Sequence, residues 1–203
     1  MPPIPPVTKW LLIVNIAAFF IDDLLRVLTG VSVGSWLALW PLGHGFLPWQ
    51  VATYAFLHGG IVHLLFNMFG LWTFGSELER LWGPDRFVRF YAASVLSAAA
   101  TQLVITSITG SPYPTVGASG GIYGLLLGFG MMFPNRQILL IIPPIPMKAK
   151  VYVTIFGALE LWMGATNVND GVAHFAHLGG MLGAFLMIRY WRGQPPFRGR
   201  RRR

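Results

Sequence analysis

Apolar residues along this chain gather into six long runs, separated by shorter stretches rich in polar residues, glycine or proline. Runs of this kind are typical of helices that cross a bilayer, because a helix hides its own backbone polar groups from lipid. We therefore predict an all-α membrane protein built as a bundle of six transmembrane helices. The predicted spans cover about 8–28, 60–78, 87–108, 119–133, 150–166 and 171–190.

The composition agrees with this pattern and narrows the chemistry. Hydrophobic residues make up 54% of the chain and charged residues only 11%, which is too apolar for an ordinary soluble domain. We expect residues 1–203 to form one membrane domain. The chain contains no cysteine, so disulfides, thiolate metal sites and cysteine nucleophiles are excluded. Any nucleophile must be an oxygen.

The positive charges indicate an orientation in the membrane. The formal net charge is +8, yet the basic residues lie between the apolar runs and in a tail over 193–203, so we expect lipid contact and no nucleic acid partner. The first, third and fifth connections carry no Lys or Arg. This asymmetry predicts that both termini are cytoplasmic. The charged connections are the second, with Arg80, Arg86 and Arg89, and the fourth, with Arg136, Lys148 and Lys150.

Three other stretches carry local signals. The first connection, 30–59, is long and rich in tryptophan and phenylalanine, so we expect it to lie in the membrane interface. Prolines 143, 144 and 146 prevent a continuous helix from the fourth span into the fifth. No cleavage site follows the N-terminal apolar run, which we interpret as an uncleaved first span.

Strongly polar residues inside the predicted spans are functional candidates, because burying them in lipid is costly. His63 and Asn67 are four residues apart on one helix face, Ser119 begins the fourth span, and His177 lies in the sixth. The fourth span covers only roughly 21 Å, so Ser119 should lie below the outer surface. His177 lies roughly 9 Å into its own span. We expect the polar groups to meet at one depth.

Small residues provide a way for the helices to approach each other. Gly120, Gly124 and Gly128 form a stripe at a spacing of four, and Gly180 with Ala184 forms another on the face that carries His177. Such stripes allow close backbone packing in membranes. A short serine side chain needs that closeness to reach an imidazole.

These residue types suggest nucleophilic catalysis by a serine. A histidine can take the proton of Ser119, and His177 is the candidate base. The amide of Ser119 at a helix N-terminus, with the side chains of His63 and Asn67, could stabilise an oxyanion. Neither Asp170, seven residues before His177, nor Glu160, on another span, is an obvious third member. We therefore predict a catalytic dyad.

Together these motifs resemble the rhomboid family of intramembrane serine proteases. The resemblance covers nearly the whole chain, including the stretches 58–60, 63–67, 117–120 and 176–180. It implies a six-helix bundle in which Ser119 is the nucleophile and His177 the general base of a serine endopeptidase that cleaves transmembrane segments of other proteins. No cofactor is implied.

The resemblance also assigns supporting parts. It implies that His63, Asn67 and Gly117 belong to the oxyanion region, that Tyr123 stacks on His177, and that the first connection lies on the membrane. Glu79 and Arg80 would form a structural cluster at the inner end of the second span.

Some alternatives remain open at this stage. His58 and His174 either serve the fold through hydrogen bonds or line a water cavity. His174 and His177 share a face and could suggest zinc, but the chain has no HExxH motif and few carboxylates, so we predict no metal. A non-proteolytic relative that binds membrane clients is the competing function. The short form suggests a prokaryotic cell membrane by analogy.

Overall fold

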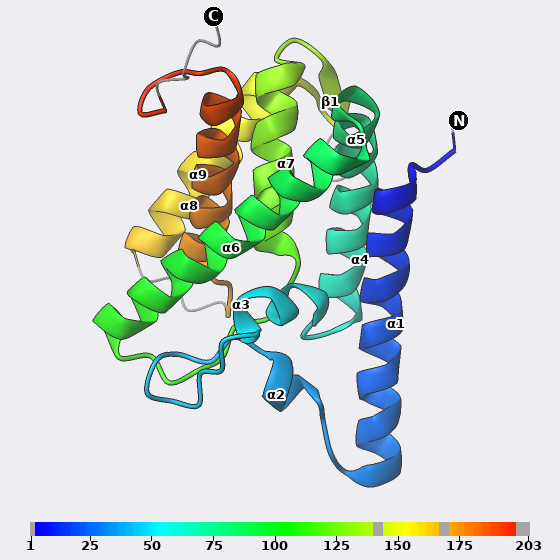
Figure 1. The fold of residues 1–203 in the computed structure, drawn as a ribbon, viewed down its shortest axis with the longest axis vertical. Helices are drawn as coiled ribbons and strands as arrows, with labels where there is room; N and C mark the ends of the chain where they lie inside the picture. The colour runs from blue at the N-terminus through cyan, green and yellow to red at the C-terminus, as the bar shows by residue number, and fades with distance from the viewer. Residues whose placement is uncertain (1–2, 140–143, 167–170, 198–203) are drawn as a thin grey trace, which may run out of the picture.

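The computed structural model of the chain describes residues 3–139, 144–166 and 171–197. Within these ranges the structure is largely helical, with one short hairpin (Figure 1). The elements in chain order are α1 (Pro6–Thr29), α2 (Gly34–Leu37), α3 (Gln50–Thr53), η1 (Tyr54–Phe56), α4 (Ile61–Gly70), η2 (Leu71–Gly75), α5 (Ser76–Trp82), α6 (Pro84–Thr109), α7 (Ser119–Met132), β1 (Gln137–Leu139), β2 (Pro146–Lys148), α8 (Ala149–Ala165) and α9 (His174–Trp191).

Each of the predicted spans coincides with a helix to within a few residues. The second span is a continuous run of α4, η2 and α5, in which η2 is a π-helical segment, and it ends at Gly83. Pro84 then begins α6, where the missing proline N–H costs nothing. Gly30 and Gly110 end α1 and α6 in the left-handed conformation that favours glycine.

The helical fold class is confirmed for most of the described residues, and the fourth connection adds a short pair of strands that was not predicted. There β1 and β2 pair in an antiparallel hairpin, with Ile138 opposite Met147. Proline cannot continue a helix, and Pro146 instead occupies the start of a short strand. Pro143 and most of the basic tail lie outside the described residues.

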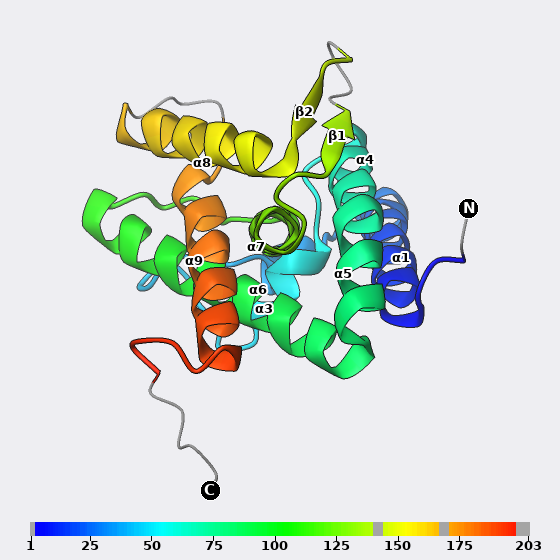
Figure 2. The same ribbon diagram turned by 90° about the horizontal axis from the view of Figure 1, so that it is seen from above.

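The short helix α7 forms the centre of the bundle. Seen from above, it is surrounded by α4 and α5, α6, α8 and α9, while α1 lies outside against α4 (Figure 2). Residues on all sides of α7 are buried. Its glycines pack against side chains of α6 and the backbone of α9. This central position surrounds the start of α7 with other helices, while the depth of Ser119 in a membrane stays a prediction.

One helix among the described residues, Pro84–Thr109, is long and apolar enough on its own to cross a membrane. The pair Gln50–Phe56 and Ile61–Trp82 meets the same criterion together, although its halves are bent by 99°. Ser119–Met132 is a shorter apolar helix. The number of spans and the cytoplasmic position of the termini therefore stay predictions. In Figure 1, α1 begins and α9 ends at the same end of the bundle.

The first connection folds against the opposite end of the bundle, where α2 and α3 lie (Figure 1). Its organiser is Gln50, which is fully buried. The Gln50 side chain accepts hydrogen bonds from the amides of Trp40 and Leu47 and donates one to the carbonyl of Trp36. Trp36 and Trp49 remain 64% and 49% exposed, which suits a segment at a membrane interface.

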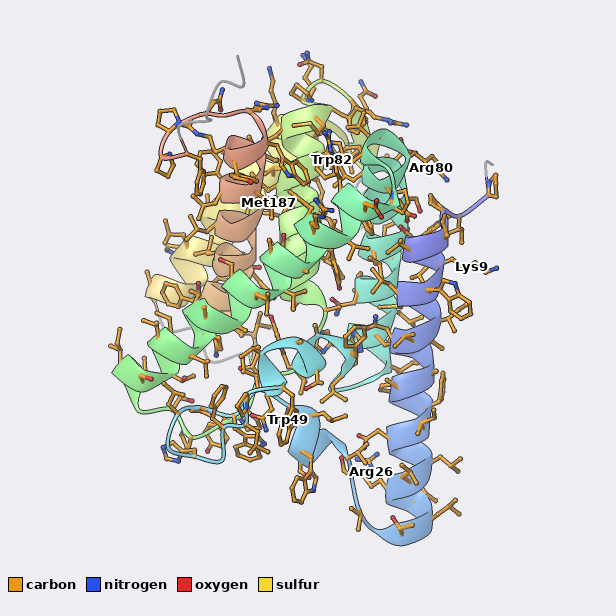
Figure 3. The ribbon with its side chains drawn as sticks, in the orientation of Figure 1. Lys9, Arg26, Trp49, Arg80, Trp82 and Met187 are labelled. Atoms are coloured by element: carbon orange, nitrogen blue, oxygen red, sulfur yellow. The ribbon has the colours of Figure 1, made fainter. Side chains whose placement is uncertain are left out.

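At the end of the second helical run, Glu79 and Arg80 each bind the start of the chain. Glu79 does not pair with Arg80. Its carboxylate instead accepts hydrogen bonds from the amides of Val7 and Thr8 and from the Thr8 hydroxyl, so it caps the N-terminus of α1. Arg80 binds Glu77 and the carbonyl of Pro3. Figure 3 places Arg80 and Trp82 at the end opposite Arg26 and Trp49.

Candidate active site

Ser119 is the first residue of α7, and the chain leading to it is tied to the first connection. Thr115 exchanges two backbone hydrogen bonds with Leu39, and the amide of Gly117 donates to the carbonyl of Tyr54. Gly117 has a φ of +130°, a conformation that side chains rarely allow. The glycine therefore permits the turn that presents the Ser119 side chain at the start of a buried helix.

His177 reaches Ser119 because α7 and α9 cross at two glycines. A methyl group at Gly180 would lie 1.8 Å from the carbonyl oxygen of Gly120, so the backbones are in direct contact. This contact lies beside Ser119 on α7 and one turn after His177 on α9. As a result Nε2 of His177 lies 2.8 Å from Oγ of Ser119. The serine is half-buried and the histidine is buried.

The Tyr123 ring lies flat against His177. The two rings are 4.2 Å apart between centroids and 6° from parallel, which is the stacking that the resemblance implies. The Tyr123 hydroxyl donates a short hydrogen bond to Oε1 of Glu160. The stack covers the flat face of the imidazole and fixes its plane. Both ring nitrogens therefore remain able to contact other groups.

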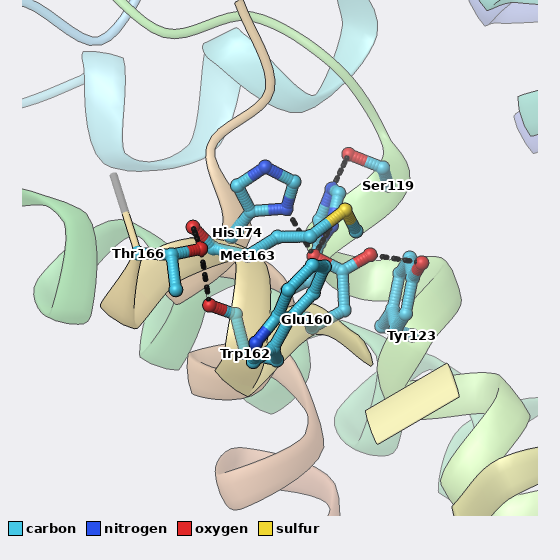
Figure 4. A network of polar contacts seen from close by, with 8 residues as sticks. Ser119, Tyr123, Glu160, Trp162, Met163, Thr166 and His174 are labelled. Atoms are coloured by element: carbon cyan, nitrogen blue, oxygen red, sulfur yellow. Dashed lines mark hydrogen bonds and ion pairs between the residues drawn. The ribbon is translucent and has the colours of Figure 1, made fainter. Parts of the chain in front are cut away.

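The prediction that no carboxylate lies near the histidine is wrong. Glu160 on α8 places Oε2 3.0 Å from Nδ1 of His177, although the two groups are not aligned for a straight hydrogen bond. The same oxygen lies 2.7 Å from Nδ1 of His174 (Figure 4). Glu160 is only 3% exposed. Burying a lone acidic residue in an apolar run costs free energy. That cost is the sequence signal that could have marked Glu160 as a functional candidate.

His174 thus belongs to the polar network around His177. It is 5% exposed, and its Nδ1 contacts the same Glu160 oxygen that faces His177. The contact is of the kind expected if His174 serves the fold, and its predicted place in a water cavity stays a prediction. Asp170, the other carboxylate considered, lies outside the described residues.

His63 and Asn67 lie one turn apart on α4. A methyl group at Gly117 would lie 2.8 Å from the His63 ring and 3.5 Å from Oγ of Ser119, so this ring borders the serine. The Asn67 amide donates one hydrogen bond to the carbonyl of His63. A primary amide carries two N–H donors. Among the described residues, the second N–H of Asn67 donates no hydrogen bond. The His63 ring is near enough to Ser119 for the predicted oxyanion region, and the part of Asn67 in it stays a prediction.

His58 packs against His63 outside the helices. The two rings are 5.2 Å apart in an edge-to-face arrangement. Burial, together with the neighbouring His63, lowers the pKa of His58 to about 4, so the ring is neutral at pH 7. His58 also borders a cavity of about 310 Å³ beside the C-terminal half of α1, and its predicted role in lining a water cavity stays a prediction.

Glu160, His174 and His177 form a set that could hold a metal ion, since one ligand atom of each lies within 4.8 Å of the others. The distances from the carboxylate oxygen to the two imidazole nitrogens, 2.7 and 3.0 Å, are those of hydrogen bonds. Ligand atoms around a tetrahedral zinc ion, with bonds of about 2.0 to 2.1 Å, lie farther apart, at about 3.3 Å. The geometry favours protons between these atoms, and the absence of a metal stays a prediction.

An apolar cleft of about 810 Å³ opens beside the site. Tyr123 belongs to its wall, which connects the cleft to the face that carries His177. The cleft lies between the second helical run and α8. Its aromatic lining includes Phe66, Phe69, Trp72, Tyr152 and Phe156.

The sequence of the chain matches a known protein family. The family model of the Rhomboid domain matches residues 46–193. Rhomboid protease GluP of Bacillus subtilis is 33% identical over 138 residues, which cover 68% of this chain and 25% of that protein. The putative rhomboid protease YdcA of the same organism is 31% identical over 160 residues, which cover 78% of this chain and 68% of that protein.

A mitochondrial relative is similar to the same degree. Rhomboid protein 1 of Saccharomyces cerevisiae is 35% identical over 135 residues, covering 63% of this chain and 37% of that protein. The chain thus spans about a quarter to two fifths of the length of GluP and of this yeast protein.

Proposed function

The chain belongs to the rhomboid family of membrane proteins, and from this we propose that it is a serine endopeptidase that cleaves a peptide bond in or beside a substrate's transmembrane segment. The observation that carries the proposal is the 2.8 Å approach of His177 Nε2 to Ser119 Oγ. A serine needs such a base to become a nucleophile.

The reaction follows from these atoms. As Oγ of Ser119 attacks the scissile carbonyl carbon, its proton passes to Nε2 of His177 and the carbonyl electrons move onto oxygen. When the tetrahedral intermediate collapses, the C–N bond breaks and the departing nitrogen takes the proton from His177. A water molecule then attacks the acyl-enzyme in the same way, with His177 again taking and returning the proton.

The charge on the intermediate needs donors that are in place beforehand. The amide of Ser119 lies in the first turn of α7, where helix N–H groups have no partner within the helix. The His63 ring lies next to Gly117, and Asn67 follows one turn later on the same helix. These donors supply the oxyanion region, which is commonly the largest contribution to acyl-transfer catalysis.

The apolar cleft supports the proposal that the substrate is a membrane protein. Aromatic side chains from α4, η2 and α8 line it, and Tyr123 links it to the site. A transmembrane helix entering this cleft would have to unwind locally to expose a carbonyl, so we expect cleavage near small or helix-breaking residues. The similar proteins include bacterial and mitochondrial members, so the prokaryotic cell membrane stays a prediction.

The test uses the purified full chain in liposomes with a single-span substrate protein. We expect cleavage and labelling of the protein by a fluorophosphonate, and the loss of both in Ser119→Ala. The matched control is Ser94→Ala, which removes a buried hydroxyl that binds only its own helix carbonyl. His177→Ala should also abolish cleavage.

Labelling that persists in Ser119→Ala would contradict the assignment of the nucleophile. Binding of membrane proteins without any turnover by the wild-type chain would favour the competing function, a non-proteolytic family member.

A further inference from the structure

Glu160 is a buried carboxylate in the middle of an apolar helix. It is 3% exposed, and a charge in such a position is costly unless several partners surround it. The polar contacts described for it all come from the site. The Tyr123 hydroxyl binds Oε1, and the Nδ1 atoms of His174 and His177 face Oε2 at 2.7 and 3.0 Å. Its position therefore concerns the chemistry of the site rather than a distant part of the fold.

The two nitrogens of His177 face different groups. Nε2 faces Ser119 and Nδ1 faces Glu160. A neutral imidazole carries one proton, and an acceptor at Nδ1 favours the tautomer with the proton there. That tautomer leaves the lone pair of Nε2 pointing at the serine, which is the form a general base requires.

We propose that Glu160 is a positioning residue for His177. It holds the imidazole in this tautomer and stabilises the imidazolium that forms when Nε2 takes the serine proton. Glu160 itself remains ionised throughout, because the proton goes from Ser119 to Nε2 and then to the departing nitrogen. Nδ1 of His177 and Oε2 of Glu160 lie 3.0 Å apart but are poorly aligned for a hydrogen bond. This hydrogen bond becomes shorter and straighter when His177 is protonated, because its Nδ1 proton is then more acidic. This inference rests on the proposed function.

The other contacts of the carboxylate fit this role. Tyr123 both stacks on the His177 ring and binds the second oxygen of Glu160, so one residue sets the positions of the two partners. His174 binds the oxygen that faces His177. Glu160 is thereby held by α7 and α9 at once, which leaves its carboxylate little freedom to turn away from Nδ1.

The competing explanation is that Glu160 only ties α8 to its neighbours. The two explanations predict different results for Glu160→Gln. This change keeps the size and most hydrogen bonds of the side chain. A carboxamide has no negative charge, and its NH₂ can donate to Nδ1 and drive the proton onto Nε2. A positioning role predicts a fall in kcat with KM unchanged, while a tie between helices predicts a loss of folded protein.

The experiment measures kcat and KM for a membrane substrate per folded molecule, with the folded fraction taken from tryptophan fluorescence and gel filtration. We expect Glu160→Gln to lower kcat by about 10² to 10⁴-fold and to change KM by less than about twofold. Glu160→Asp keeps the negative charge, one methylene farther away. Its kcat should be at least about tenfold higher than that of Glu160→Gln. The control is Asp85→Asn, an exposed acidic residue on α6, which should behave as wild type.

Two results would overturn this proposal while leaving the proposed function intact. One is a Glu160→Gln protein whose kcat per folded molecule stays within about twofold of wild type. The other is an equal loss in Glu160→Asp and Glu160→Gln that follows the loss of folded protein. A wild-type chain that neither cleaves nor takes the fluorophosphonate label would overturn the proposed function, and this proposal with it.

Discussion

Gly180 of α9 packs directly on the backbone of Gly120 of α7. A single methyl group at Gly180 would lie 1.8 Å from the Gly120 carbonyl oxygen, far inside van der Waals contact. Gly120 follows Ser119, and Gly180 lies three residues after His177. The crossing of the two helices therefore sets the distance between the nucleophile and its base.

Gly180→Ala should push the two helices apart. Overpacking of this kind costs about 1 to 3 kcal/mol of unfolding free energy, and a displacement of about 1 Å between reacting groups costs about 10²-fold in kcat. Thermal unfolding in detergent and cleavage in liposomes measure the two effects. The control is Gly157→Ala on α8, where the nearest atom is the flexible end of Met181 at 3.3 Å. Equal activity of the two variants would contradict this account of the crossing.

Gly117 should be equally sensitive, for a different reason. Its φ of +130° strains any other residue, and a methyl group there would lie 2.8 Å from the His63 ring. Gly117→Ala therefore displaces His63 from the oxyanion region, and we expect a fall of about 10²-fold in kcat. Gly59→Ala is the matched control, because its methyl group would lie 3.9 Å from the same ring. A Gly117→Ala enzyme with normal kcat would separate His63 from catalysis.

Chelation should leave the activity unchanged. The close contacts of Glu160 with His174 and His177 are hydrogen-bond distances, shorter than ligand atoms around zinc would be. We expect full cleavage by protein treated with EDTA or dipicolinate and then dialysed, with metal content checked by elemental analysis. Activity that disappears on chelation and returns with Zn²⁺ would instead make these side chains metal ligands.

The parts of the structure that follow local rules could be predicted from the sequence. Long apolar runs located the helices, and Pro84 and Gly110 mark where α6 begins and ends. The pairing of Ser119 with His177 was also predicted, because polar residues inside apolar helices are rare and small residues flank both. The resemblance to a family added the roles of the two residues, and the helix crossing at Gly120 and Gly180 brings them together.

What could not be predicted depends on tertiary packing. Glu160 lies 17 residues before His177 on a separate helix, and only the way α8 packs on α9 brings its carboxylate to Nδ1. The hairpin strands are three residues long, too short for an alternating pattern. The bond from Glu79 to the start of α1 joins residues 71 apart in the chain, and nothing in the neighbouring Arg80 indicated it.

That bond leads to a prediction about α1. The Glu79 carboxylate is 2% exposed and accepts hydrogen bonds from the amides of Val7 and Thr8 at 2.9 and 2.7 Å. Glu79→Ala leaves these donors without their acceptor in a buried place and removes a negative charge from the positive end of the α1 dipole. We expect a loss of about 3 kcal/mol of unfolding free energy, measured by thermal or denaturant unfolding in detergent.

Glu79→Gln separates the two contributions to this loss. The carboxamide oxygen can still accept one hydrogen bond, but the charge is gone, so its loss should be smaller than that of Glu79→Ala. Glu77→Ala is the control, because its ion pairs with Arg80 and Arg136 are partly exposed and exposed pairs contribute only about 0 to 1 kcal/mol. If Glu77→Ala destabilised the protein as much as Glu79→Ala, the general loss of acidic charge at this end would matter, and the cap on α1 would not. If only the Glu79 variants destabilise it, the cap on α1 contributes specifically to stability, beside the packing of α1 on its neighbouring helices.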